Sequence, residues 1–201
     1  VAQQLYEGLE LGDLGSTGLI NYMRTDSTRV AGEALSAARN VIKHLFDEKH
    51  LPDSPRAFGK SKAAQDAHEA IRPAQVEAEF APKMIKGYLS RDQFRLYELI
   101  WRRFLASQMA NAIFDSTRVD ITADDCLFRA TGSIMKFDGF LALYEESTED
   151  GGESSEGRND TLPDVSKGTT LNLNALTPRQ HFTQPPPRYS EASLVRELED
   201  K

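Results

Sequence analysis

Residues 113–134 read IFDSTRVDITADDCLFRATGSI, and here the hydrophobic period of the chain changes from 3.6 to 2. Val119 and Ile121 alternate with polar residues, and 123–125 has the composition of a turn into a second strand, 127–134. The residues before this change have helical spacing. A helical part followed by a strand-rich part predicts an α+β fold.

Besides a helical pattern at Val1, Leu5 and Leu9, three helices are expected before residue 113. Apolar residues at helical spacing follow Ser27 or Thr28, either of which is a good helix cap, and predict a helix to about residue 48. A short helical piece is expected over 64–71. Ser90 with Gln93 three residues later forms a capping box, which predicts the start of another helix. The first 112 residues are therefore expected to be mostly helical.

The second part of the chain is expected to be less regular. The segment 145–160 is acidic, rich in Gly and Ser and poor in apolar residues, which is typical of a mobile loop. Alternation at Leu171–Leu173 predicts another strand. Residues 184–187 read QPPP, a stiff linker, and Ser190 then caps a helix that is expected to continue past Lys201. Since Val1 also falls within a helical pattern, we expect the 201 residues to be part of a longer protein.

Composition and charge limit the class of protein. Hydrophobic residues make up 39% and charged residues 27% of the 201 residues, as in soluble globular proteins, with no apolar run near 18 residues and no signal peptide. Cys126 is the only cysteine, which excludes an internal disulfide and a cysteine-cluster metal site and fits a cytoplasmic setting. Residues 1–112 carry 15 Lys and Arg against 14 Asp and Glu, whereas 113–201 carry 9 against 17. The net charge of −7 is therefore concentrated in the second part, and the near-neutral first part remains compatible with a nucleic-acid partner.

The stretch with the clearest chemistry is 18–28, GLINYMRTDST. Tyr22 offers a phenol that can attack phosphorus and form a covalent link to a nucleic acid. Arg24 offers a guanidinium, the group best shaped to hold a phosphate by two hydrogen bonds. Asp26 could orient Arg24 or cap the following helix. The residues alone also allow an ordinary buried tyrosine beside a surface arginine.

A second candidate lies at 66–73, DAHEAIRP. His68 and Arg72 are four residues apart and would share one face of a helical turn, where they could hold a phosphate together. A solvated polar turn is the alternative. The segment lacks the second histidine of a zinc helix, so no metal ligand is expected in it. The chain also has no glycine-rich phosphate loop.

Three stretches resemble the signatures of one enzyme family. The active-site signature of the type IA DNA topoisomerases is similar to residues 18–27, GLINYMRTDS. A second signature of that family is similar to residues 67–73, AHEAIRP, and a third to residues 182–195, FTQPPPRYSEASLV. Met23 and the run after His68 resemble bacterial topoisomerase I more than topoisomerase III. One residue departs from the pattern: Asn21 stands where the family usually has Thr.

The resemblance implies a domain organisation. Residues 1–112 would form the helical, nucleophile-carrying domain with a winged-helix (CAP-like) core, 113–183 a β-rich arch or hinge, and 184–201 the start of a further DNA-binding domain, all within a toroidal enzyme. The Toprim domain that binds Mg²⁺ in this family has no counterpart in these residues. We therefore expect the fragment to be inactive alone and to contain no metal site.

The resemblance also implies a mechanism. Tyr22 would cleave single-stranded DNA through a 5′-phosphotyrosine intermediate and Arg24 would stabilise the phosphate, after which a strand passes and religation relaxes negative supercoils. Residues implied to contact DNA or phosphate are His68, Arg72, Asp26, Asn21, Arg188, Ser190 and Ser193. The expected partner is the single-stranded part of negatively supercoiled DNA in the bacterial nucleoid, with no membrane, and unpaired strand edges favour self-association of the fragment. Alternatives are a topoisomerase III or reverse-gyrase-type member of the family, or a non-catalytic helix-turn-helix DNA-binding module.

Overall fold

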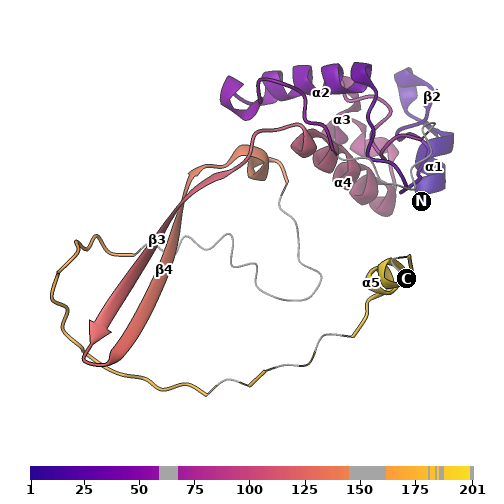
Figure 1. Cartoon of the computed structure of the whole chain (residues 1–201). Coiled ribbons are helices and arrows are strands. Elements are labelled where there is room, and N and C mark those ends of the chain that lie inside the picture. The colour runs from indigo at the N-terminus through magenta and orange to yellow at the C-terminus, as the bar shows by residue number, and fades with distance from the viewer. Residues whose placement is uncertain (59–67, 145–161, 181, 184, 186–187, 200–201) are drawn as a thin grey trace.

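A computed structural model describes residues 1–58, 68–144, 162–180, 182, 183, 185 and 188–199. Figure 1 shows a helical unit, a long hairpin that projects from it, and a chain that returns from the hairpin tip to a final helix. Helices and strands are both present, which confirms the α+β prediction at that level. The winged-helix core, the arch and the domain limits remain predictions.

The helical unit begins with small elements around a tight turn. The helix α1 (Ala2–Glu7) is followed by the strand pair β1 (Leu9–Glu10) and β2 (Ser16–Thr17), with the 3₁₀ turn η1 (Gly12–Leu14) between them. At Gly18 the chain passes so close to α1 that a Cβ there would lie 2.6 Å from the backbone oxygen of Tyr6. This close approach requires glycine just before residues 19–26, the tyrosine segment.

Two longer helices form the body of the unit. The helix α2 (Gly32–Leu45) and the helix α4 (Arg91–Ser107) contact one another, with η2 (Glu48–His50), η3 (Ala78–Phe80), α3 (Pro82–Ile85) and η4 (Lys86–Tyr88) between them in the chain. The capping box predicted at the start of α4 is confirmed, because the Ser90 side chain accepts from Gln93 N–H and the Gln93 side chain accepts from Ser90 N–H. The apolar faces of these helices meet α1 and the tyrosine segment in one core. Its members include Leu5, Leu11, Leu19, Ile20, Ala38, Ile42, Val76, Phe80, Ile85, Tyr97, Trp101, Phe104, Leu105 and Met109.

Two of the predicted helices are wrong in detail. The helix α2 begins at Gly32, not at Ser27 or Thr28, and ends at Leu45 rather than near residue 48. The Ser27 hydroxyl oxygen instead accepts from the Arg29 backbone N–H at 3.2 Å, a local turn that competes with a helix cap. Residues 68–71 are not helical, and the rest of the piece expected over 64–71 lies outside the described residues.

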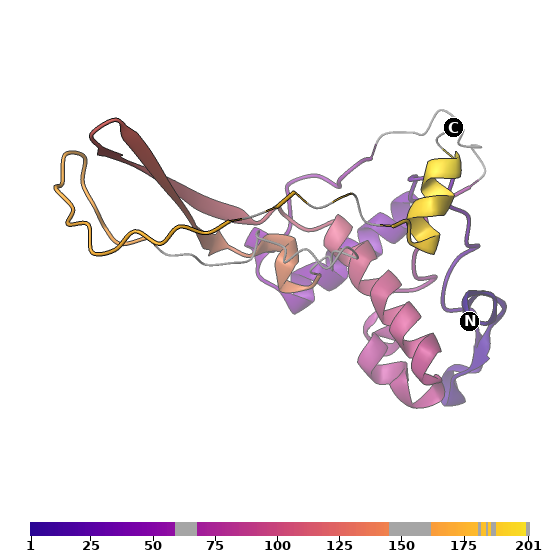
Figure 2. The same ribbon diagram turned by 90° about the horizontal axis from the view of Figure 1, so that it is seen from below.

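The predicted hairpin is confirmed. The strands β3 (Ile113–Ala123) and β4 (Cys126–Phe137) pair antiparallel from Ile113 opposite Phe137 to Ala123 opposite Cys126, and the turn at Asp124 has a positive φ of 49°. Figure 2 shows the hairpin extending away from the helices, and the chain at 162–180 passing its tip. The strand expected at Leu171–Leu173 is wrong, because within 162–180 the backbone forms no sheet pairing.

The hairpin is attached to the helical unit through its base. His50 on η2 contacts Asp47 through Nδ1 at 2.6 Å and Asp138, which follows β4, through Nε2 at 3.0 Å. The short helix η5 (Gly139–Ala142) follows at once, and Phe140 N–H donates to the Ala110 carbonyl at 2.9 Å. Gly139 has φ +51°, and a Cβ there would lie 2.5 Å from the backbone carbon of Asn111. The base of the hairpin is thus fixed to the helical unit.

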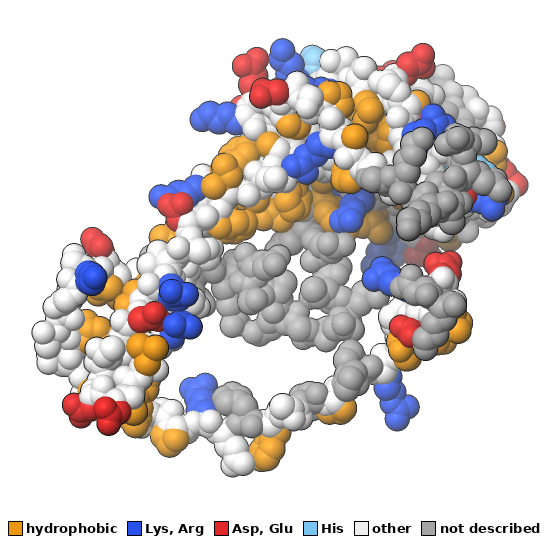
Figure 3. Space-filling view, in the orientation of Figure 1, with side chains coloured by type: hydrophobic (Ala, Val, Ile, Leu, Met, Phe, Trp, Pro, Cys, Tyr) orange, Lys and Arg blue, Asp and Glu red, His pale blue; other side chains and the backbone are white. Residues whose placement is uncertain are grey.

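The remaining expectations concern the end of the chain. The helix α5 (Glu191–Glu199) is present, and the Ser190 hydroxyl accepts from Ser193 N–H at 3.2 Å, which confirms the predicted cap. The segment 145–160 and most of the linker at 184–187 lie outside the described residues. Among the described residues, no helix is long and apolar enough to cross a membrane. In Figure 3, basic and acidic side chains are interspersed on the visible face, without one continuous basic field.

Candidate active site

The tyrosine segment is anchored on the buried side by two apolar residues. Leu19 and Ile20 are 1% and 2% exposed and belong to the core, and Leu19 N–H donates to the Leu5 carbonyl at 2.7 Å. These anchors hold the backbone immediately before Tyr22. The next residues therefore leave the core and reach the surface.

Tyr22 lies on that surface. Its side chain is 54% exposed, so the alternative of an ordinary buried tyrosine is wrong. Its ring meets the ring of Tyr6 edge to face, with the centroids 5.4 Å apart and the planes at 62°, a favourable arrangement for two aromatic rings. Tyr6, which the sequence did not single out, thus restricts the direction of the Tyr22 ring. No local pattern could have shown this contact, because Tyr6 belongs to a different element.

Arg24 and Asp26 follow Tyr22 in an irregular loop. Arg24 N–H donates to the Tyr22 carbonyl at 3.1 Å, and the Arg24 side chain is exposed. Among the described residues, the Arg24 guanidinium has no hydrogen-bond or ion-pair partner, which leaves it available for an anion. Asp26 does not cap α2, which begins six residues later.

Asp26 instead pairs with His68. The Asp26 Oδ2 and His68 Nδ1 atoms are 2.9 Å apart, and both side chains are mostly buried, at 24% and 18% exposed. Burial acts to raise the pKa of the Asp26 carboxyl, but the hydrogen bond and charge of His68, together with the charge of Arg24, more than offset it and hold that pKa below its ordinary value of 3.8. Asp26 is therefore ionised at neutral pH. His68 uses Nδ1 for this pair, so Nε2 is the ring nitrogen left for a ligand.

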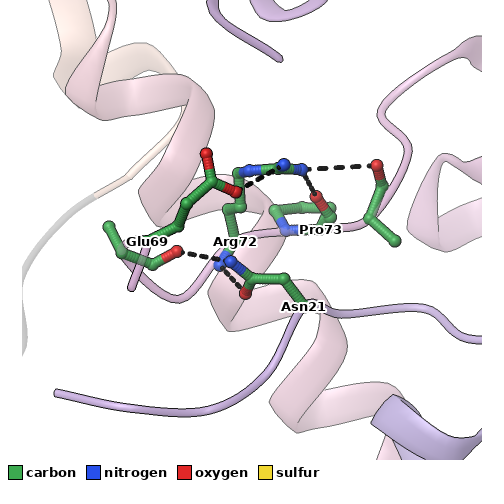
Figure 4. A network of polar contacts seen from close by, with 6 residues as sticks. Asn21, Glu69, Arg72 and Pro73 are labelled. Carbon is green, nitrogen blue, oxygen red and sulfur yellow. Dashed lines mark hydrogen bonds and ion pairs between the residues drawn. The ribbon is translucent and has the colours of Figure 1, made fainter. Parts of the chain in front are cut away.

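Arg72 is occupied by protein groups. Its Nη2 donates to Glu69 Oε2 at 2.8 Å, and its Nη1 donates to the carbonyls of Pro73 and Ala74 at 2.9 and 3.4 Å (Figure 4). The prediction that His68 and Arg72 share one face of a helical turn is wrong, because residues 68–72 are not helical and the two side chains bind different partners. Arg72 here stiffens the segment that carries His68.

Asn21 contacts the same segment. Its Nδ2 donates to the Ala70 carbonyl at 2.8 Å, and its Oδ1 accepts from the Arg72 backbone N–H at 2.9 Å (Figure 4). Ile20 and Pro73 form an isolated antiparallel bridge beside these bonds. The tyrosine segment and the segment 68–74 therefore lie side by side. Sequence reasoning missed these contacts because they join residues about 50 positions apart.

The third group of predicted site residues lies on or near α5. Arg188 is exposed, and the Ser190 and Ser193 hydroxyls contact each other at 3.1 Å within the helix cap. Among the described residues, no hydrogen bond, ion pair or ring contact joins these three to Tyr22. The structure thus brings Tyr22, Arg24, Asp26, Asn21, His68 and Arg72 into one region and leaves the α5 residues separate from it.

Within the described residues, no three His, Cys, Asp or Glu side chains converge closely enough to hold a metal ion. No step below depends on the Mg²⁺ that the resemblance implies. A groove of about 510 Å³ on α4 is lined by other residues, including Arg95, Arg102 and Tyr144, so Tyr22 lies outside it.

Comparison with known proteins identifies the family of the chain. The family described as DNA topoisomerase (Topoisom_bac) matches residues 1–201. The solved structure of full-length topoisomerase I from Thermotoga maritima is similar over 99% of this chain, with 37% sequence identity and a TM-score of 0.76. The chain belongs to the bacterial type IA DNA topoisomerases. It spans 30% of the length of the Thermotoga maritima chain.

Proposed function

We propose that this chain carries the nucleophile of a topoisomerase I that cleaves single-stranded DNA through Tyr22. The observation that carries the proposal is the grouping of the exposed Tyr22, the exposed Arg24 and the Asp26–His68 pair in one region. The segments on which these groups lie are those that resemble the family signatures. A topoisomerase of this family acts on DNA, and the phosphodiester is the group that this chemistry suits.

The proposed reaction is a transesterification. The Tyr22 hydroxyl oxygen bonds to phosphorus, the bond from phosphorus to the 3′ oxygen of the preceding nucleotide breaks, and the phenolic proton ends on that 3′ oxygen. The 5′-phosphate remains on Tyr22, and religation reverses each change. No redox partner is needed. Passage of a second strand between these two steps would relax negative supercoils.

The neighbouring groups have separate roles in this proposal. The exposed Arg24 guanidinium holds the scissile phosphate and stabilises the negative charge that develops on its oxygens. Asp26 holds the His68 ring through Nδ1. In the protonated, imidazolium form of His68, Nε2 also carries a hydrogen and can donate it to a phosphate oxygen. Asp26 thus orients another group and makes no contact with DNA of its own.

The test is a covalent trapping experiment on a full-length topoisomerase that contains residues 1–201. A single-stranded oligonucleotide is labelled at its 3′ or its 5′ end, incubated with the enzyme and denatured with detergent. With a 5′-phosphotyrosine link, the 3′ label should remain on the protein and the 5′ label should be released on a fragment ending in a 3′ hydroxyl. Tyr22→Phe should abolish the adduct, because the attacking oxygen is removed.

Tyr88→Phe is the matched control. Tyr88 is 51% exposed, close to the 54% of Tyr22, and removal of its hydroxyl should leave the adduct yield unchanged. An adduct that forms equally well on the Tyr22→Phe enzyme would exclude Tyr22 as the nucleophile. Retention of the 5′ label instead of the 3′ label would exclude the proposed polarity of the link.

A further inference from the structure

We propose that Asn21 is a positioning residue, whose side-chain amide fixes the segment 68–74 to the loop that carries Tyr22 and thereby sets where His68 stands relative to the Tyr22 hydroxyl. The inference rests on the proposed role of Tyr22 and goes beyond it. It assigns to Asn21 a task that depends on protein–protein contacts and not on contact with DNA.

The Asn21 amide continues a strand pairing that the backbone cannot continue. The backbone pairs as Ala74 N–H to the Leu19 carbonyl at 2.9 Å and Asn21 N–H to the Arg72 carbonyl at 3.1 Å. After Asn21 the chain turns outward and exposes Tyr22, so the Arg72 N–H and the Ala70 carbonyl lose any strand partner there. The two polar atoms of the amide bind these two groups, at 2.9 and 2.8 Å.

The tyrosine loop is attached to the same segment at its other end. His68 contacts Asp26 at 2.9 Å, and Ala70 N–H donates to the Arg29 carbonyl at 2.7 Å. The loop 22–25 is thus held at both ends, by Asn21 before it and by Asp26 and Arg29 after it. Loss of either attachment would let the loop shift relative to His68.

The segment 68–74 is stiff enough to transmit this constraint. The Arg72 guanidinium binds Glu69 and the carbonyls of Pro73 and Ala74, so it links the two halves of the segment. A displacement at Ala70 or Arg72 therefore moves the backbone that carries His68. Figure 4 shows Asn21 on one side of this segment and the Arg72–Glu69 contact on the other.

The geometry favours positioning over direct recognition of DNA. The Asn21 side chain is half-buried, and both of its polar atoms already have backbone partners. A threonine hydroxyl, which the family usually has here, is a single polar atom in place of two. It would satisfy fewer of the backbone groups that the asparagine amide binds.

The experiment compares Asn21→Ala, Asn21→Thr and the control Asn40→Ala in a full-length topoisomerase that contains residues 1–201. Asn40 lies exposed on α2, and its side chain has no hydrogen-bond partner among the described residues. The dissociation constant for a single-stranded oligonucleotide and the single-turnover rate of adduct formation are measured separately, at a temperature where circular dichroism shows all variants folded.

For Asn21→Ala we expect the adduct rate to fall about 10- to 100-fold, since small misplacements of reacting groups have effects of this size, while the dissociation constant changes by less than about threefold. The adduct rate of Asn21→Thr should lie between the rates of Asn21→Ala and the unmodified enzyme. The adduct rate of Asn40→Ala should equal that of the unmodified enzyme. A dissociation constant that weakens as much as the rate falls would show that Asn21 contacts DNA. An unchanged rate would also overturn the proposal.

A second measurement separates this inference from the proposed function. In the chain of residues 1–201, Asn21→Ala should speed amide hydrogen exchange at Arg72, whose N–H loses its acceptor, and Asn40→Ala should not. Unchanged exchange at Arg72 would overturn the positioning role even if Tyr22 is the nucleophile. Faster exchange at Arg72 together with an adduct on the Tyr22→Phe enzyme would support the Asn21–Arg72 contact and exclude Tyr22 as the nucleophile.

Discussion

Asp26 links the electrostatics of the site to the stability of the fold. Its pKa is held below 3.8, mainly by the contact with His68 against the opposing effect of burial. A carboxylate with a lowered pKa in the folded state stabilises that state above the pKa of the unfolded chain. The stabilisation is lost as the pH falls through the lower, folded value. The relevant window therefore lies below pH 3.8 and not near neutrality.

The prediction concerns Asp26→Asn. The difference in the free energy of unfolding between the unmodified chain and this variant should be constant at neutral pH and should shrink as the pH falls below 3.8. Urea denaturation followed by circular dichroism at a series of pH values measures it. In a His68→Ala background the pH-dependent part of the difference should be smaller. A difference that stays the same down to pH 2.5 would contradict the pairing.

At the scale of elements, local signals predicted some of the structure well. Ser90 and Gln93 marked the start of α4, and the alternation around Val119 with the turn at 123–125 predicted the β3–β4 hairpin. Both depend on residues close together in the chain. The capping box satisfies backbone groups within one helical turn, and the turn joins strands that pair directly.

The error at residues 68–71 occurred where a distant segment competes for the backbone. The composition of residues 68–71 favours a helix. Ala70 N–H instead donates to the Arg29 carbonyl, and the Ala70 carbonyl accepts from Asn21 Nδ2, so these backbone groups are not available for helical hydrogen bonds. The strand expected at Leu171–Leu173 has a suitable pattern but no pairing partner among the described residues. Tyr22 and Arg24 are predicted as site residues from their chemistry and from the family resemblance, whereas the contacts of Asn21 with the segment 68–74 depend on the fold.

A test at this scale addresses the junction of β4 and η5. Gly139 has φ +51°, and an added Cβ would lie 2.5 Å from a backbone atom of Asn111. Gly139→Ala should therefore lower the free energy of unfolding by about 2 kcal/mol or more, because both the conformation and the space exclude a side chain.

Gly32→Ala is the control for this prediction. Gly32 begins α2 with ordinary φ and no atom within 4 Å of the position of a Cβ. The change should be neutral or should stabilise by up to about 1 kcal/mol, since alanine favours a helix more than glycine does. Urea denaturation of the two variants side by side measures both effects. Equal effects would mean that the close approach at Gly139 does not exist.

At the scale of the whole molecule, His50 joins the helical unit to the hairpin. Its side chain is 12% exposed, lies between Asp47 and Asp138, and packs against the rings of Phe46 and Phe137 at centroid distances of 5.2 and 4.7 Å. His50→Ala should lower the free energy of unfolding by about 2 kcal/mol, mostly through lost packing, since the two carboxylates are largely exposed and their charges are screened.

His44→Ala is the matched control, measured by the same denaturation. His44 is exposed, and within the described part of the chain its Nδ1 contacts only the Asn40 carbonyl of its own helix. Its replacement should therefore change the free energy of unfolding by less than about 0.5 kcal/mol. An equal loss from both variants would show that His50 does not hold the hairpin base.

A firmly held base makes the hairpin a lever arm. With strands of 11 and 12 residues, the arm is roughly 36 Å long, so a rotation of about 5° at the base would carry its end through roughly 3 Å. Cys126, the only cysteine among the 201 residues, is exposed at the far end of this arm. A fluorophore or spin label attached to its thiol would therefore sit where angular motion of the helical unit is most magnified, in a chain that needs no other thiol removed.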